Sequence, residues 1–119
     1  MIKPDIISAL EKLTAHQFIE ITTRGDAAIT AALSIIPQDQ VVLIPEEGGW
    51  LSYPKIPKKL GLKVVDVKCD DAKINLEDLH KKLKEHSCGT LLYQNPGGYF
   101  AEQPMEEIFQ LCQKKNCLV

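Results

Sequence analysis

The chain has 119 residues, 45% of them hydrophobic, which is enough for one domain, or part of one, with a buried core. Its formal net charge of −2 at pH 7 argues against nucleic acid as the main partner. The sequence has neither the apolar run of a signal peptide nor a transmembrane stretch, so no membrane partner is expected.

The first third of the chain is predicted to form a helix, a short strand and a second helix. An apolar stripe along Pro4–Leu13 predicts the first helix, and residues 1–16 are expected to form an N-terminal helix packed on the core. Phe18–Ile21 alternates apolar and polar residues, as a half-buried strand does. The Ala-, Ile- and Leu-rich segment Ala27–Ile36 predicts a second helix, which Pro37 ends.

Strands and helices then alternate along the rest of the chain. The predicted strands are Val41–Ile44, Lys63–Val67 and Thr90–Gln94, the predicted helices are Trp50–Leu60, Leu76–Glu85 and Gln103–Lys115, and Cys117–Val119 begins a further apolar segment. Strands separated by helices of this length predict right-handed crossovers between parallel strands. We therefore expect an α/β fold in three layers, with a mostly parallel sheet, helices on both faces and a single domain over residues 1–119.

Three loops follow predicted strands and precede predicted helices, at residues 22–26, 45–50 and 95–100. In a parallel sheet such loops lie together outside the carboxyl ends of the strands, where ligands bind. The first loop offers hydroxyl groups, the guanidinium of Arg24 and backbone N–H groups, which suit a phosphate. The second offers the aromatic ring of Trp50 and the third the amide of Asn95. Together they predict a site for a flat phosphorylated ring.

Each loop also has a simpler interpretation. Gly25 is then only a turn residue, and Asp26 is the N-cap of the following helix. Trp50 is then a packed surface aromatic, and Asn95 with the Pro and Gly after it forms an ordinary turn. The meeting of the three loops, more than any one of them, favours a binding site.

Disulfide and metal chemistry find little support in the sequence. None of the four cysteines belongs to a Cys-x-x-Cys pair, so they are expected to be reduced thiols of a cytoplasmic protein. Cys112 falls on an apolar helical stripe and is expected in the core. The three histidines form no ligand pair at metal spacing, so no metal site is expected.

Five short segments follow one another in an informative order: Gly25–Ala28, Asp39–Pro45 with Trp50 after it, Gly61–Val65, Asn75–Leu79 and Asn95–Gly98. This ordered set resembles the large domain of pyridoxal-phosphate enzymes of the aspartate aminotransferase fold. Within this group, the set is similar to the sugar aminotransferases of the DegT/StrS type. The resemblance covers nearly the whole chain from about Gln17 onward.

The resemblance implies pyridoxal 5′-phosphate as cofactor and assigns residues to it. Gly25, Asp26 and Ala27 match the small-residue turn whose backbone holds the cofactor phosphate. Trp50 matches the aromatic residue that stacks on the pyridine ring. Asn95 matches an amide that some members place near the phenolic oxygen of the ring.

The chain also departs from the family pattern. Most members have Ser or Thr in place of Asp26, whose carboxylate repels a phosphate dianion, and Arg24 is expected to offset that repulsion. The family's ring-nitrogen Asp and imine-forming Lys lie at positions beyond Val119, so we assign no catalytic residue.

We therefore expect a truncated aminotransferase-like chain, ending inside a strand, that does not transfer amino groups alone. Its expected partners are a small-molecule cofactor or substrate, and either further copies of itself or a missing C-terminal half, because a sheet ending at Val119 leaves an apolar edge uncovered. Two alternatives remain open. One is a non-catalytic α/β domain that binds a ligand or a protein partner, although the glycine motifs of nucleotide sites are absent. The other is part of a pyridoxal-phosphate-dependent lyase or decarboxylase.

Overall fold

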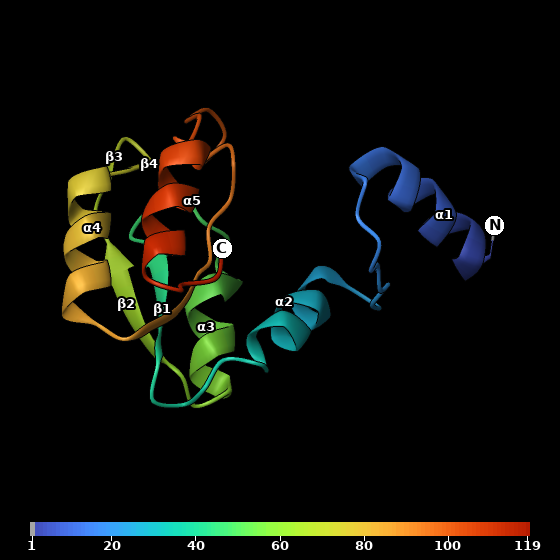
Figure 1. Cartoon of the computed structure of the whole chain (residues 1–119), viewed down its shortest axis with the longest axis horizontal. Helices are drawn as coiled ribbons and strands as arrows, with labels where there is room; N and C mark the ends of the chain where they lie inside the picture. Colours follow the sequence, from blue (N-terminus) through green and yellow to red (C-terminus); the bar gives the residue numbers. More distant parts are fainter. Residues whose placement is uncertain (1) are drawn as a thin grey trace.

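The computed structural model describes residues 2–119. Its centre is a three-stranded parallel sheet in the order β2–β1–β5, formed by Lys63–Val67, Val41–Pro45 and Cys88–Leu91. Figure 1 labels β1 and β2 of this sheet. Close to the C-terminus Leu118 forms a parallel bridge with Thr90, so the apolar segment predicted there lies beside β5.

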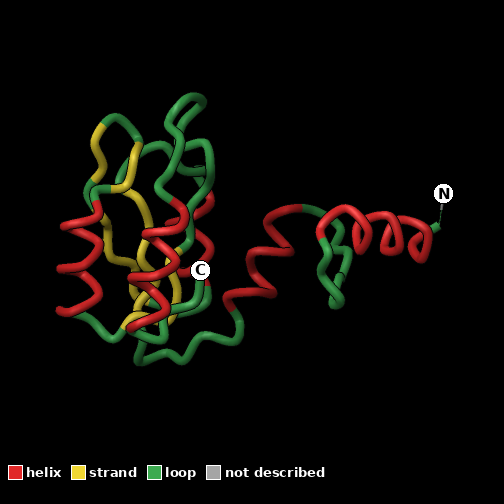
Figure 2. Tube along the Cα trace, turned by 45° about the horizontal axis from the view of Figure 1, so that its top comes forward, coloured by secondary structure: helices red, strands yellow, loops and turns green. Residues whose placement is uncertain are grey.

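Helices cover both faces of this sheet. One face carries α2 (Gly25–Leu33) and α3 (Ser52–Lys59), and the other carries α4 (Leu76–Glu85) and α5 (Met105–Lys114). Figure 2 shows the strands enclosed between helical segments. This arrangement confirms the predicted α/β fold class.

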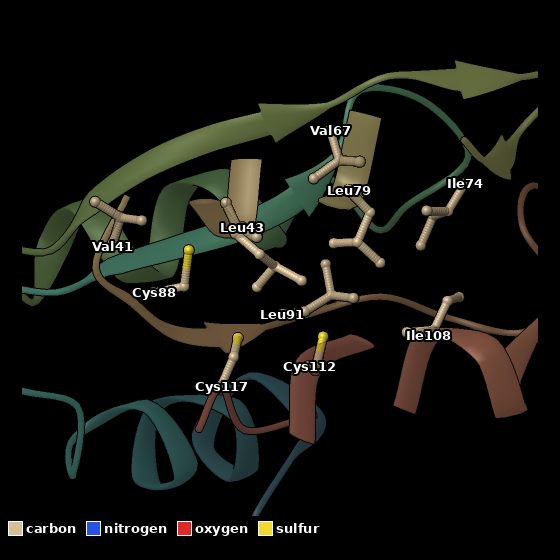
Figure 3. Packing of buried hydrophobic residues seen from close by; sticks show 11 residues of the cluster. Val41, Leu43, Val67, Ile74, Leu79, Cys88, Leu91, Ile108, Cys112 and Cys117 are labelled. Carbon is tan, nitrogen blue, oxygen red and sulfur yellow. The ribbon is translucent and has the colours of Figure 1, made fainter. Parts of the chain in front are cut away.

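The central strand β1 is buried on both faces because its side chains alternate between two hydrophobic clusters. Val42 and Ile44 belong to the cluster with α2 and α3, and Val41 and Leu43 to the cluster with α4 and α5. Figure 3 shows the second cluster, to which Cys112 of α5 contributes as predicted. Burying one such aliphatic side chain stabilises a fold by about 1.5–3 kcal/mol.

Local sequence explains where several elements begin and end. The Oδ1 atom of Asn75 accepts a hydrogen bond from the backbone N–H of Asp78 at 2.9 Å and so caps α4. Gly61 follows α3 with φ +78°, a conformation that glycine adopts without strain. The polar turn at Asp71 and Ala72, both with positive φ, joins a short antiparallel hairpin.

The strands of that hairpin are β3 (Cys69–Asp70) and β4 (Lys73–Ile74). Two elements show larger shifts of their boundaries from the predicted ones. The helix expected from Ala27 begins two residues earlier and ends at Leu33, and the strand expected at Thr90–Gln94 runs over β5 instead.

The N-terminal region differs most from the predictions. The predicted first helix is present as α1 (Lys3–Thr14), but none of its residues is buried and it lies away from the sheet (Figure 1). Packing of the expected N-terminal helix, residues 1–16, on the core is not seen for α1, and residue 1 lies outside the described residues. Phe18–Ile21 is not a strand, and the Phe18 side chain is 94% exposed. A strand needs a neighbour for its backbone groups, and within residues 2–119 none lies beside this segment.

Candidate functional site

A cavity of about 380 Å³, here called the α2 cavity, is lined by three separate parts of the chain. Its lining residues are Arg24, Gly25, Asp26 and Ile29 at the start of α2, Trp50 and Tyr53 around the start of α3, and Gln94 after β5. The structure therefore brings together four of the six predicted site residues. The third predicted loop contributes none of its own residues, but Gln94 immediately before it lines the cavity.

Backbone donors are concentrated at the N-terminus of α2. The first helical hydrogen bond runs from the N–H of Ala28 to the carbonyl oxygen of Arg24 at 3.2 Å. The N–H groups of Gly25, Asp26 and Ala27 precede it and have no partner within the helix. The side chain of Arg24, the N-cap residue, makes no capping hydrogen bond to them. Free N–H groups and the positive end of the helix dipole together favour a bound anion.

The side chains at this helix end leave room for an anion. A Cβ atom added to Gly25 would have no other heavy atom within 4 Å. Arg24, in an extended conformation, is the N-cap, so the interpretation of Asp26 as the N-cap is wrong. Asp26 is the second residue of α2, and Ala27 follows it half-buried.

Polar contacts connect Trp50 with the start of α2. The indole Nε1–H of Trp50 donates to Ser52 Oγ at 3.0 Å, and the Ser52 hydroxyl donates to Asp26 Oδ2 at 3.3 Å. The same carboxylate oxygen lies 3.5 Å from Nη2 of Arg24. The Asp26 carboxylate thus has two donors of its own, and its charge is partly offset by the guanidinium. The Trp50 side chain is 58% exposed, which leaves much of the indole free to contact a ligand.

The third loop is held by its own internal contacts. Asn95 Oδ1 accepts a hydrogen bond from the backbone N–H of Gln103 at 2.8 Å, and Asn95 does not line the α2 cavity. The Gln94 amide donates to the carbonyl oxygens of Pro96 and Gly98 at 3.3 and 3.4 Å. The N–H of Gly98 donates to the carbonyl oxygen of Gly48 at 2.7 Å, so the second and third loops are joined.

A second cavity of about 510 Å³, here called the β2 cavity, shares Trp50 and Tyr53 with the first. It extends along the loop after β1, where Glu46 and Glu47 also line it. These carboxylates accept hydrogen bonds from backbone N–H groups of the β3–β4 region, from Cys69 at 2.9 Å and from Ala72 at 2.7 Å. The loop that carries Trp50 is therefore fixed to the hairpin.

Tyr53 remains a hydrogen-bond donor between the two cavities. Partial burial raises the pKa of its phenol above the ordinary value of 10, so the hydroxyl is protonated at neutral pH.

The predictions from sequence missed three residues of this region: Ser52, Tyr53 and Gln94. Tyr53 lies three residues after Trp50, a spacing that places both on one side of a helix, and Gln94 immediately precedes a predicted site residue. Those spacings were available signals. Nothing in the sequence indicated Ser52, because its contact with Asp26 joins residues 26 positions apart.

In residues 2–119 no group of three His, Cys, Asp or Glu is placed to hold a metal ion. The four cysteines are free thiols. No helix within the same residues has the length and apolar character needed to cross a membrane.

Comparison with protein families gives a match over residues 7–119 to the model described as aminotransferase class I and II. The narrower likeness to the DegT/StrS type is not confirmed. The comparison with curated proteins found no match.

Solved structures of two aminotransferases and a C–S lyase have the same fold. Histidinol-phosphate aminotransferase from Clostridium acetobutylicum superposes with a TM-score of 0.74 at 19% identity over 97% of this chain and 35% of its own. Alanine–glyoxylate aminotransferase from a Nostoc species gives 0.72 at 21%, over 97% and 33%. A C–S lyase from Staphylococcus hominis, solved with pyridoxal phosphate bound, gives 0.71 at 17%, over 97% and 33%. The chain therefore spans about a third of the length of the solved structures it matches.

Proposed function

The chain belongs to the class I and II aminotransferase family, and on this premise we propose that its α2 cavity binds the phosphate and the ring of pyridoxal phosphate. The observation that carries the proposal is one cavity lined both by the N-terminus of α2 and by the indole of Trp50. An anion site beside an aromatic side chain matches the phosphate and the flat ring of this cofactor.

The residues present fit such a group. The N–H groups of Gly25, Asp26 and Ala27 are unpaired within α2, and no side chain takes them. The guanidinium of Arg24 adds a positive charge beside them. The repulsion expected from Asp26 is reduced, because its carboxylate is already paired with Arg24 and Ser52.

Each side chain of the cavity then has a separate task. The α2 N-terminus and Arg24 bind the phosphate, and Trp50 covers one face of the ring and excludes water from it. Gln94, and not Asn95, lines the cavity with a side-chain amide, and its N–H groups are held by the carbonyl oxygens of Pro96 and Gly98. Bound pyridoxal phosphate supplies an electron sink for reactions of amino acids.

Covalent attachment of the cofactor is not part of this proposal. No lysine is among the described residues that line the α2 cavity. We propose that the chain holds the cofactor by non-covalent contacts and does not transfer amino groups alone.

Calorimetric titration with pyridoxamine phosphate tests the proposal. This compound keeps the ring and the phosphate but has no aldehyde, so it does not react with surface lysines. We expect saturable binding, and binding weaker by about tenfold or more for pyridoxamine and for inorganic phosphate, because each lacks half of the contacts.

Two variants separate the halves of the site. Arg24→Ala is expected to weaken pyridoxamine phosphate but not pyridoxamine, whereas Trp50→Ala is expected to weaken both. Equal affinities for pyridoxamine phosphate and pyridoxamine, or no binding at millimolar ligand, would contradict the proposal.

A further inference from the structure

The Ser52 hydroxyl occupies a particular place in the contacts around Trp50. An indole N–H can only donate a hydrogen bond, and an ionised carboxylate can only accept one. A hydroxyl does both, and Ser52 accepts from Trp50 at 3.0 Å and donates to Asp26 at 3.3 Å. The Ser52 hydroxyl can therefore link the indole, which only donates, to the carboxylate, which only accepts.

A simpler role for Ser52 would be to cap α3, which begins at this residue. The structure does not support that role, because the N-cap of α3 is Leu51 and no side-chain capping bond is present. The hydroxyl instead forms a hydrogen bond from α3 to α2, with a residue 26 positions earlier in the sequence.

These contacts also explain how the Asp26 carboxylate is compatible with an anion site at the N-terminus of α2. Asp26 Oδ2 accepts a hydrogen bond from the Ser52 hydroxyl on one side and lies 3.5 Å from Arg24 on the other. The carboxylate is thereby held by side-chain donors, and the backbone N–H groups of α2 are left for another acceptor.

We propose that Ser52 and Asp26 are positioning residues that hold the Trp50 indole against the N-terminus of α2, so that the ring-binding and phosphate-binding parts of the site keep a fixed separation. This inference rests on the proposed function for its consequence in binding, but the fixing of Trp50 can be tested without any ligand.

The first experiment measures the motion of Trp50 alone. Trp50 is the only tryptophan, so time-resolved fluorescence anisotropy reports on this side chain without labels. Ser52→Ala and Asp26→Ala are each expected to enlarge the fast local component of the decay. Ser52→Thr, which keeps the hydroxyl, is expected to behave as the unaltered chain.

A matched control and a double variant make this experiment specific. Ser34→Ala removes a hydroxyl bonded only to the Ala31 carbonyl oxygen at the end of α2, and no change is expected. If Ser52 and Asp26 act as one relay, the double variant loosens Trp50 no further than either single variant. An unchanged decay in Ser52→Ala, or fully additive effects, would overturn the inference.

The second experiment measures binding of pyridoxamine phosphate by the same variants. Loss of one hydrogen bond that fixes the ring is expected to weaken binding about fivefold in Ser52→Ala, with recovery in Ser52→Thr. Should Trp50 loosen as expected while even the unaltered chain binds no ligand, the positioning role stands and the proposed function fails. Should the unaltered chain and Ser52→Ala bind equally well, the positioning role is wrong and the proposed function stands.

Discussion

Single atoms decide how closely the loops around the site approach the β3–β4 hairpin. A Cβ atom added to Gly97 would collide with the carbonyl oxygen of Ala72 and the side-chain amide of Gln103. Both neighbours are engaged, since that amide donates to that carbonyl oxygen at 2.9 Å. The third loop therefore tolerates no side chain at this position without moving the hairpin.

Gly97→Ala is accordingly expected to lower the free energy of unfolding by about 1–3 kcal/mol, as overpacking does. Gly25→Ala serves as the matched control, because its added methyl group meets nothing within 4 Å and alanine suits a helix better than glycine. Urea unfolding of the two variants measures the difference. Similar midpoints for both would show that the packing around Gly97 is looser than described.

The buried thiol of Cys88 gives the fold a pH dependence. Burial, with a smaller contribution from Cys112, raises the pKa of the Cys88 thiol from 9.0 to about 11. The folded chain thus holds this proton more tightly than the unfolded chain does. Its contribution to stability is full below about pH 9 and is lost as the pH rises through 11.

We therefore expect the free energy of unfolding to fall between pH 9 and pH 11 more steeply for the unaltered chain than for Cys88→Ala. Urea unfolding under reducing conditions, repeated across this range, gives both slopes. Parallel curves would mean that Cys88 titrates alike in the folded and unfolded chains.

The role of a single residue can be predicted from the sequence where that role is local. Asn75 caps α4 by accepting a hydrogen bond from a residue only three positions later, and Gly61, with its positive φ, lies directly at the end of α3. Asn95 was a different case. Its hydrogen bond to the backbone of Gln103 depends on how the loop folds back over eight residues. Ser52 could not be predicted for the same reason, since its partner lies in another helix.

At the scale of elements, the capping residue Asn75 explains why α4 starts at the predicted residue, Leu76. Asn75 accepts the Asp78 N–H at 2.9 Å and also donates to the Asp70 carboxylate at 3.0 Å. Asn75→Ala is expected to lower the free energy of unfolding by about 1 kcal/mol. Asn75→Asp keeps a capping oxygen but faces Asp70, so it should recover only part of the loss. Chemical unfolding measures both, and full stability of Asn75→Ala would exclude a capping role.

The pattern of apolar residues identified those elements that are buried by other parts of the same chain. β1 was predictable because a continuous apolar run suits a strand buried on both faces, and all five of its residues are buried. Phe18–Ile21 has the alternation of a strand but was predicted wrongly. The pattern records only which side chains could be buried, whereas a strand forms only where backbone partners are available.

For the whole molecule, the contrast between the sheet region and α1 leads to a prediction about stability. α1 has no buried residue, and the ion pair of Lys3 with Glu20 at 3.7 Å joins exposed side chains. An isolated helix of 12 residues is only marginally stable in water. Amide hydrogens of α1 are therefore expected to exchange with solvent much faster than those of β1.

Hydrogen exchange followed by mass spectrometry measures this difference, with α4 as a second, well-packed helix for comparison. Equal protection of α1 and α4 would show that α1 is covered in solution, by another copy of the chain or by its own core.

We propose that two loops of the sheet and the start of α2 form one site for an anionic aromatic ligand. Titration of the isotope-labelled chain with pyridoxamine phosphate, followed by two-dimensional amide NMR, tests it most directly. We predict that the backbone signals of Gly25, Asp26 and Ala27 and the indole N–H signal of Trp50 shift together with one dissociation constant, while the signals of α4 stay in place. Shifts of the α2 signals without Trp50, or shifts confined to other parts of the chain, would contradict the account.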